Sequence, residues 1–150
     1  MKQIQGDIWK SEANAICIPT NGIVKANGDA VMGAGLALQA TMYYPPLPKY
    51  LGHCLQKFGN QVFMFPLTSD MISGEPIVIT FPTKNDWKKG SRIDLIQKSA
   101  NELVKMADGL PGLKRIAIPR VGCGKGGLKW EQVCPLLQKV FDDRFEVWER

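Results

Sequence analysis

Two glycine-rich segments carry the residues best suited to chemistry. Residues 118–130 read IPRVGCGKGGLKW, in which a β-branched apolar run passes into a loop with four glycines and then into helical spacing. Gly122, Gly124, Gly126 and Gly127 permit positive φ and close approach of the backbone to a ligand. Because such a loop turns N–H groups toward an anion, and the next helix adds its dipole, the segment predicts a phosphate or diphosphate site. A ligand-free strand-to-helix connection is the alternative.

A second segment repeats the pattern of strand, glycine loop and helix. Residues 16–22 read ICIPTNG, and residues 30–39 read AVMGAGLALQ. Two loops of this kind in one small protein predict a ligand that is held from both sides. Neither loop fits GxxxxGK[ST], and residues 33–35 lack the third glycine and the downstream acid of a dinucleotide fingerprint. The sequence therefore disfavours a kinase and a dehydrogenase.

Lys84 is the best candidate for a catalytic side chain. The chain has one histidine, His53, which we expect to lie away from the site, so a Ser-His-Asp or Cys-His mechanism is implausible. Cys123 lies beside the second loop but lacks an evident base, and packing is its expected role. Lys84 begins a segment, residues 84–92, that carries three further cations. Their positive charge disfavours the protonated form of the Lys84 amine, so that a fraction of the amine is neutral and nucleophilic. A solvated loop lysine is the alternative.

Composition limits the classes of protein to consider. The 150 residues suit one domain, and the net charge of +5 favours polyanionic partners, with basic clusters at residues 84–92 and 114–129. Four cysteines without a CxxC pair, beside a single histidine, predict reduced thiols, no metal and no cofactor. The polar start, and the absence of an apolar run near ~20 residues, predict no signal peptide and no membrane segment. We expect a cytoplasmic monomer.

Alternating strands and helices must position these residues. The expected strands are residues 3–9, 13–19, 62–66, 76–81, 115–121 and 145–148. The expected helices are residues 36–43, 49–58, 91–109 with Ser91 as N-cap, and 129–141. Residues 68–74 are expected to join two strands as a hairpin-like connection. This order predicts a three-layer α/β/α sandwich with a mixed central sheet, in which ligands bind beyond the carboxyl ends of the strands.

The sequence resembles the macro domain family, whose members hold ADP-ribose between two such loops. Five pieces in the order of the family carry the resemblance: Gly6-Asp7-Ile8, Pro19-Thr20-Asn21, Met32-Gly33-Ala34-Gly35, Phe81-Pro82-Thr83-Lys84, and residues 119–124 with Leu128-Lys129-Trp130. They cover nearly the whole chain, so residues 1–150 are expected to be a single macro domain. The last of these pieces and the piece at residues 81–84 look most like the branch of the terminal ADP-ribose protein glycohydrolases and the antitoxins that remove ADP-ribose from DNA.

The resemblance implies roles for particular residues. Asp7 would hold the adenine amine with help from the backbone of Ile8, and the alternative from the sequence alone is that Asp7 caps a turn. Lys84 would attack or polarise C1″ of the distal ribose, which Asn21 would position. The protein glycohydrolases carry an aspartate where this chain has residues 125–127, so Lys84 is expected to act here as an electrostatic or proton-transfer catalyst. The implied ligand-binding set is Asp7, Ile8, Thr20, Asn21, Met32, Gly33, Ala34, Gly35, Leu36, Pro82, Thr83, Pro119, Arg120, Val121, Gly122, Cys123, Gly124, Lys125, Gly126, Gly127 and Leu128.

The predicted function is hydrolysis that releases ADP-ribose from a modified macromolecule, DNA or protein. Two alternatives stay open. One is a phosphatase or deacetylase of small derivatives, ADP-ribose 1″-phosphate or O-acetyl-ADP-ribose. The other is an ADP-ribose-binding module without turnover. The expected partner is ADP-ribose or an ADP-ribosylated macromolecule, including nucleic acid.

Overall fold

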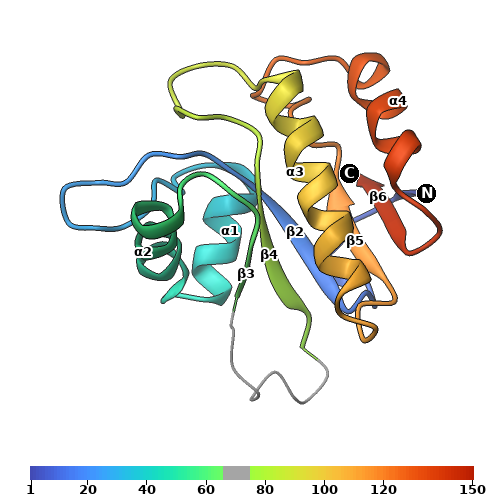
Figure 1. The fold of residues 1–150 in the computed structure, drawn as a ribbon, viewed down its shortest axis with the longest axis horizontal. Coiled ribbons are helices and arrows are strands. Elements are labelled where there is room, and N and C mark those ends of the chain that lie inside the picture. Colours follow the sequence, from blue (N-terminus) through green and yellow to red (C-terminus); the bar gives the residue numbers. More distant parts are fainter. Residues whose placement is uncertain (66–74) are drawn as a thin grey trace.

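Two layers of helices enclose a central sheet in the computed structural model, which describes residues 1–65 and 75–150 (Figure 1). The strands in the described residues are β1 (Lys2–Gln5), β2 (Ala15–Thr20), β3 (Phe63–Phe65), β4 (Ile77–Pro82), β5 (Ile116–Pro119) and β6 (Phe145–Glu149). The helices there are the 3-10 turn η1 (Ile8–Lys10), α1 (Gly35–Tyr43), α2 (Leu47–Phe58), α3 (Ile93–Asp108) and α4 (Trp130–Val140).

The sheet is mixed, as predicted. Its described strands follow the order β1-β6-β5-β2-β4-β3, and every neighbouring pair is parallel except the antiparallel pair β3 and β4. The predicted hairpin-like connection at residues 68–74 lies outside the described residues. The three-layer α/β/α sandwich is confirmed.

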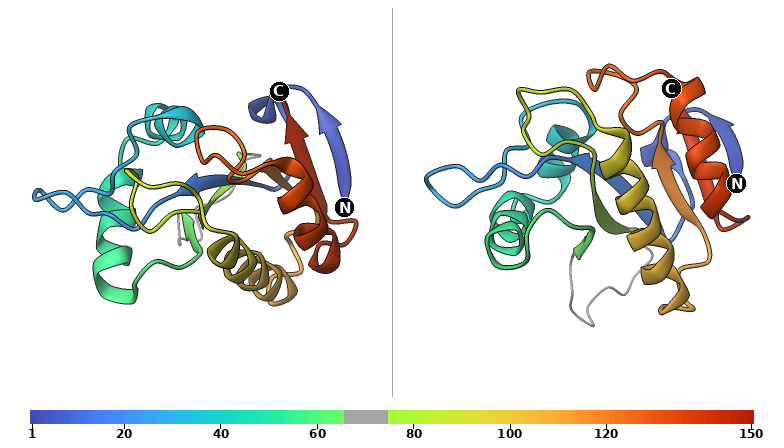
Figure 2. Two further views of the ribbon diagram at one scale, coloured as in Figure 1. Left: turned by 90° about the horizontal axis from the view of Figure 1, so that it is seen from above. Right: turned by 45° about the horizontal axis from the view of Figure 1, so that its top comes forward.

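Successive residues of the central strands face opposite helical layers. In β2, Ile16 and Ile18 pack into a cluster with α1 and α2, whereas Ala15 and Cys17 pack into a second cluster with α3 and α4. Figure 2 shows these two pairs of helices on the two sides of the sheet. Because both faces are covered, these strands are apolar at nearly every position instead of alternating. This arrangement places the carboxyl ends of β2, β4 and β5 next to one another at the same end of the sheet.

Three of the differences from the expected boundaries have a visible cause. The first strand stops at Gln5, because the Asp7 carboxylate accepts a hydrogen bond from the Trp9 N–H at 3.0 Å and starts the turn η1. Helix α3 begins at Ile93 with no side-chain cap, so Ser91 is not its N-cap. Helix α2 begins at Leu47, two residues before the expected start, because proline is tolerated in the first turn of a helix.

Gly52 in α2 allows the helix to pack closely against the segment that leads to the first loop. A Cβ atom at Gly52 would overlap the carbonyl oxygen of Gly28 and lie 3.0 Å from the Ala30 nitrogen. We therefore expect Gly52→Ala to lower the free energy of unfolding by about 2–4 kcal/mol, measured by chemical denaturation. Gly112→Ala is the matched control, since a Cβ there meets nothing within 4 Å. Equal stability of the two variants would contradict this packing.

Candidate functional site

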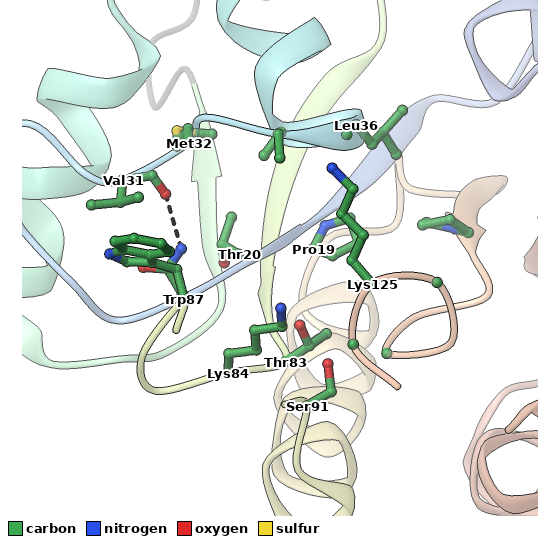
Figure 3. Close-up of a pocket in the computed structure, with 18 of the residues that line it drawn as sticks. Pro19, Thr20, Val31, Met32, Leu36, Thr83, Lys84, Trp87, Ser91 and Lys125 are labelled. Carbon is green, nitrogen blue, oxygen red and sulfur yellow. Dashed lines mark hydrogen bonds between the residues drawn. The ribbon is translucent and has the colours of Figure 1, made fainter. Parts of the chain in front are cut away.

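A cavity of about 810 Å³ opens at the carboxyl ends of β2, β4 and β5 (Figure 3). Three segments surround it: residues 31–37, residues 83–91 and residues 119–126. The lining residues are Pro19, Thr20, Asn21, Val31, Met32, Gly33, Ala34, Gly35, Leu36, Ala37, Thr83, Lys84, Trp87, Ser91, Pro119, Arg120, Gly122, Gly124, Lys125 and Gly126. Both predicted glycine loops therefore meet at one cavity.

The first loop presents the N-terminus of α1 to the cavity. Ala34 occupies the N-cap position, and its side chain can accept no hydrogen bond from the first turn. The N–H groups of residues 32–35 have no hydrogen-bond acceptor among the residues that the structure describes. Open N–H groups at the positive end of a helix form an anion site. This loop can bind a phosphate group.

The second loop is folded on itself and also leaves N–H groups open. The Leu128 N–H donates to the Gly122 carbonyl at 3.0 Å, and the Gly127 N–H donates to the Gly124 carbonyl at 3.2 Å. Gly122 and Gly127 have φ of 78° and 81°, while the other two glycines do not need positive φ. Within the described chain, the N–H groups of residues 122, 124, 125 and 126 have no acceptor. The loop can therefore bind a second phosphate group.

Gly126 serves close packing. A Cβ atom at Gly126 would overlap the Ser91 hydroxyl and lie 2.5 Å from the Gly122 carbonyl oxygen. The Ser91 N–H donates to the Gly126 carbonyl at 2.9 Å. The Ser91 hydroxyl itself is buried at the cavity with no hydrogen-bond partner among the described residues. Residues 83–91 and the second loop are thus fixed to one another.

Asn21 ties the end of β2 to the first loop. Its Nδ2 donates to the Val31 carbonyl at 2.9 Å, drawn as the dashed line in Figure 3, and its Oδ1 accepts from the Ile23 N–H at 3.0 Å. The same region is joined to residues 83–91, because the Thr83 N–H donates to the Thr20 carbonyl at 3.0 Å. Asn21 therefore acts on the cavity by holding the first loop in place.

The charged side chains at the cavity are all cations. Lys84 lies two residues after the end of β4, and Lys125 reaches in from the second loop (Figure 3). Neither has an acidic partner in the described part of the chain, whereas Arg120 pairs with Glu149 at 3.0 Å. Among the described lining residues none is Asp, Glu, His or Cys. The cavity is suited to an anionic ligand. It offers two unpaired amines, that of Lys84 from residues 83–91 and that of Lys125 from residues 119–126.

Comparison with known proteins identifies the fold family. The macro domain family matches residues 24–137. The chain belongs to the macro domain family. It is 29% identical over 143 residues to a DNA ADP-ribosyl glycohydrolase from Mycobacterium tuberculosis (strain ATCC 25618 / H37Rv), covering 95% of this chain and 39% of that protein. A protein of the same name from Thermus aquaticus is 25% identical over 151 residues, 99% of this chain and 40% of that one.

Solved structures agree with this assignment. The macrodomain of Thermus aquaticus DarG superposes with a TM-score of 0.78 at 26% identity, covering 98% of this chain and 95% of that chain. The macrodomain of Mycobacterium tuberculosis DarG superposes with a TM-score of 0.80 at 24% identity, covering 99% of this chain and 97% of that chain. At this identity the likeness is one of fold alone. The present macro domain spans about two-fifths of the length of the curated relatives that it matches.

Most of the predicted site residues line the cavity of the macro domain, but seven do not. These are Asp7, Ile8, Pro82, Val121, Cys123, Gly127 and Leu128. Val121 is wholly buried in the core, and the Cys123 thiol donates to the Val121 carbonyl at 3.5 Å. Burial raises the pKa of the Cys123 thiol, with a smaller lowering by Arg120. The thiol is therefore protonated at neutral pH, which suits packing.

Five lining residues were absent from the predicted set: Pro19, Val31, Ala37, Trp87 and Ser91. Val31 directly precedes the predicted residues of the first loop, and Ala37 directly follows them in α1. Neither is of a residue type that indicates ligand contact. Trp87 is different, because it is half exposed, at 50%, on a loop rich in lysine. An aromatic residue among cations was a usable sign of ligand contact.

Asp7 has a structural partner in the macro domain, and its predicted adenine contact can be separated from that role. Asp7→Ala should weaken ADP-ribose binding about tenfold, measured by calorimetry, while ribose 5-phosphate binding persists. Asp7→Asn keeps an acceptor for the Trp9 N–H, so it should retain stability yet lose the same selectivity for adenine. Equal losses for ligands with and without adenine would give Asp7 a structural role alone.

No helix in the described part of the macro domain has the length and apolar character needed to cross a membrane. Within residues 1–65 and 75–150, no group of three or more His, Cys, Asp and Glu side chains is placed to hold a metal ion.

Proposed function

We propose that this macro domain binds ADP-ribose in the cavity and hydrolyses the bond that joins ADP-ribose to DNA. One observation carries the proposal: two loops with open N–H groups line a single cavity that has no acidic residue among its described lining residues, and Lys84 lines the same cavity just beyond the end of β4. The relatives named DNA ADP-ribosyl glycohydrolase support the choice of DNA over protein as the target.

The cavity matches the charge pattern of ADP-ribose. The diphosphate would accept hydrogen bonds from the open N–H groups of residues 32–35 and of residues 122, 124, 125 and 126, with the helix dipole of α1 behind the first of these sets. Lys125 would add a charge-assisted contact to the same group. The distal ribose would then extend toward Lys84, where the target leaves the cavity.

Hydrolysis breaks the bond between C1″ and the target, and water supplies a hydroxyl to C1″ and a proton to the leaving group. In its ammonium form Lys84 can donate that proton to the leaving atom as the bond breaks. The bound diphosphate offsets positive charge that develops on the ribose and can order the attacking water. Asn21 contributes by fixing the first loop against β2. No step requires an acidic side chain in the cavity.

Domain organisation, cellular setting and oligomeric state follow from the same observations. We infer that residues 1–150 form a single domain, supported by β1 and β6, which bring both ends of this range into one sheet. We infer a cytoplasmic setting, supported by four free thiols, since reducing compartments preserve thiols. A monomeric state is inferred from the domain size and would be checked by light scattering.

A substrate panel tests the proposed activity. ADP-ribosylated single-stranded DNA, ADP-ribosylated protein and ADP-ribose 1″-phosphate are each incubated with the protein, and released ADP-ribose is quantified. We expect release from DNA to be fastest. Fastest release from ADP-ribose 1″-phosphate would indicate a phosphatase of small derivatives. Binding of ADP-ribose with a Kd of about 1–10 µM and no turnover of any substrate would indicate a binding module.

A further inference from the structure

Trp87 has an exposed ring at the edge of the cavity that the binding of ADP-ribose does not explain. The side chain lines the cavity, yet 50% of the residue is exposed. In Figure 3 its ring lies on the side of Val31, while Lys125 reaches in from the opposite loop. An indole in this position can offer one face to a molecule that extends out of the cavity.

The loop that carries Trp87 is held in place before any ligand binds. The Asn85 carbonyl accepts from the Gly22 N–H at 3.1 Å, and Asn60 Nδ2 donates to the Lys84 carbonyl at 3.0 Å. At the tip of the loop, the Lys88 N–H donates to Asp86 Oδ1 at 2.9 Å. An aromatic side chain has few rotatable bonds, and on a backbone that is already held it loses little conformational entropy when a partner stacks on it.

Two lysines next to Trp87 give the loop its positive charge. Lys88 places its amine 5.5 Å from the centre of the Trp87 ring, and Lys89 is its neighbour in sequence. Neither amine has an acidic partner in the described residues, whereas Arg92 is paired with Asp94 at 3.1 Å. An exposed aromatic ring beside unpaired cations is the combination that binds single-stranded nucleic acid, through base stacking and phosphate contacts.

We propose that Trp87, Lys88 and Lys89 form a rim that holds the DNA strand next to its ADP-ribosylated base: Trp87 stacks on an unpaired base, and the two lysines contact backbone phosphates. This inference rests on the proposed function, because it assumes that the target leaves the cavity at Lys84, three residues before Trp87. A target linked through an amino-acid side chain would gain neither contact. The rim therefore selects a nucleic-acid strand as the carrier of ADP-ribose.

Two substrates that differ only in the strand test the rim. One is an ADP-ribosylated single-stranded oligonucleotide, and the other is the same ADP-ribosylated base as a lone nucleoside. The readout is the ratio of kcat/KM for the oligonucleotide to kcat/KM for the nucleoside. Trp87→Ala should lower this ratio about tenfold, in line with the stacking of one base. Trp87→Phe should restore most of it, and Lys88→Ala with Lys89→Ala should reduce the dependence of oligonucleotide KM on salt.

Phe58 supplies the matched control. It is 54% exposed and has the Lys57 amine 5.3 Å from its ring centre, but it does not line the cavity. Phe58→Ala should leave the substrate ratio at the wild-type value. The rim is overturned if Trp87→Ala keeps the wild-type ratio, or if Phe58→Ala lowers it equally.

Binding of an unmodified fluorescent oligonucleotide separates this inference from the proposed function. Anisotropy at low salt should show weaker binding for Trp87→Ala than for the wild type or Phe58→Ala. If no ADP-ribosylated DNA is hydrolysed but this difference is found, the proposed function fails and the rim stands. If DNA is hydrolysed but Trp87→Ala changes neither binding nor the ratio, the rim fails alone. Absence of both turnover and Trp87-dependent binding overturns both.

Discussion

Lys84→Ala is expected to lower the release of ADP-ribose from ADP-ribosylated DNA by about two orders of magnitude or more, with less than about a tenfold change in ADP-ribose affinity. The two quantities separate because different groups carry them. The open N–H groups of the two glycine loops would hold the diphosphate, and these groups belong to the backbone. The amine of Lys84 would act only on the bond at C1″. Single-turnover kinetics and calorimetry measure the two effects.

Lys84→Arg distinguishes two ways in which the amine could act. Arginine keeps the positive charge but stays protonated at neutral pH, so retained activity would indicate electrostatic help. Lost activity would indicate that the amine must exchange a proton or attack, either by donating a proton from the ammonium form or by acting in its neutral form as base or nucleophile, and a borohydride-trapped adduct on the wild-type protein would identify the nucleophile. Unchanged hydrolysis by Lys84→Ala would remove the lysine from the mechanism.

Gly124→Val is expected to weaken ADP-ribose binding by about 2–4 kcal/mol, which is roughly 30- to 1,000-fold in Kd, without unfolding the protein. A Cβ atom at Gly124 meets nothing within 4 Å, and this glycine lines the cavity, so the added side chain would occupy the space intended for phosphate. Affinity is measured by calorimetry and stability by thermal unfolding.

Gly112→Val is the control for the valine itself, because a Cβ at Gly112 also meets nothing within 4 Å and this residue is remote from the lining set. It should bind ADP-ribose like the wild type. Gly126 would be a poor choice, since a Cβ there overlaps the Ser91 hydroxyl and disturbs the loop before any ligand arrives. Wild-type affinity in a folded Gly124→Val protein would mean that the second loop does not contact the diphosphate.

The layers of the fold could be predicted from the sequence, because the hydrophobic pattern of each strand and helix matches its place in the structure. The apolar run at residues 15–19 is continuous, and the structure gives β2 a helical layer on each face. The ends of β2, β4 and β5 then bring the two glycine loops together, so the cavity follows from strand order. These features depend on residue type over several positions, which a single sequence displays.

The missed features depend on contacts between distant segments. Asp7 ends the first strand early because its carboxylate accepts the Trp9 N–H. The Ser91 hydroxyl faces Gly126 and leaves α3 uncapped, and only the packing of the second loop against residue 91 shows this. From the sequence alone, Trp87 could have been a core residue or a solvent-exposed one. Its place beside the cavity depends on the hydrogen bonds that hold its loop.

The most direct test of the account is a crystal structure of Lys84→Ala grown with ADP-ribose. We expect the diphosphate to lie between residues 32–35 and residues 122–126, within hydrogen-bond distance of the open N–H groups there, with C1″ of the distal ribose beside residue 84. ADP-ribose bound outside this cavity, or bound with its adenine end at residue 84, would contradict it.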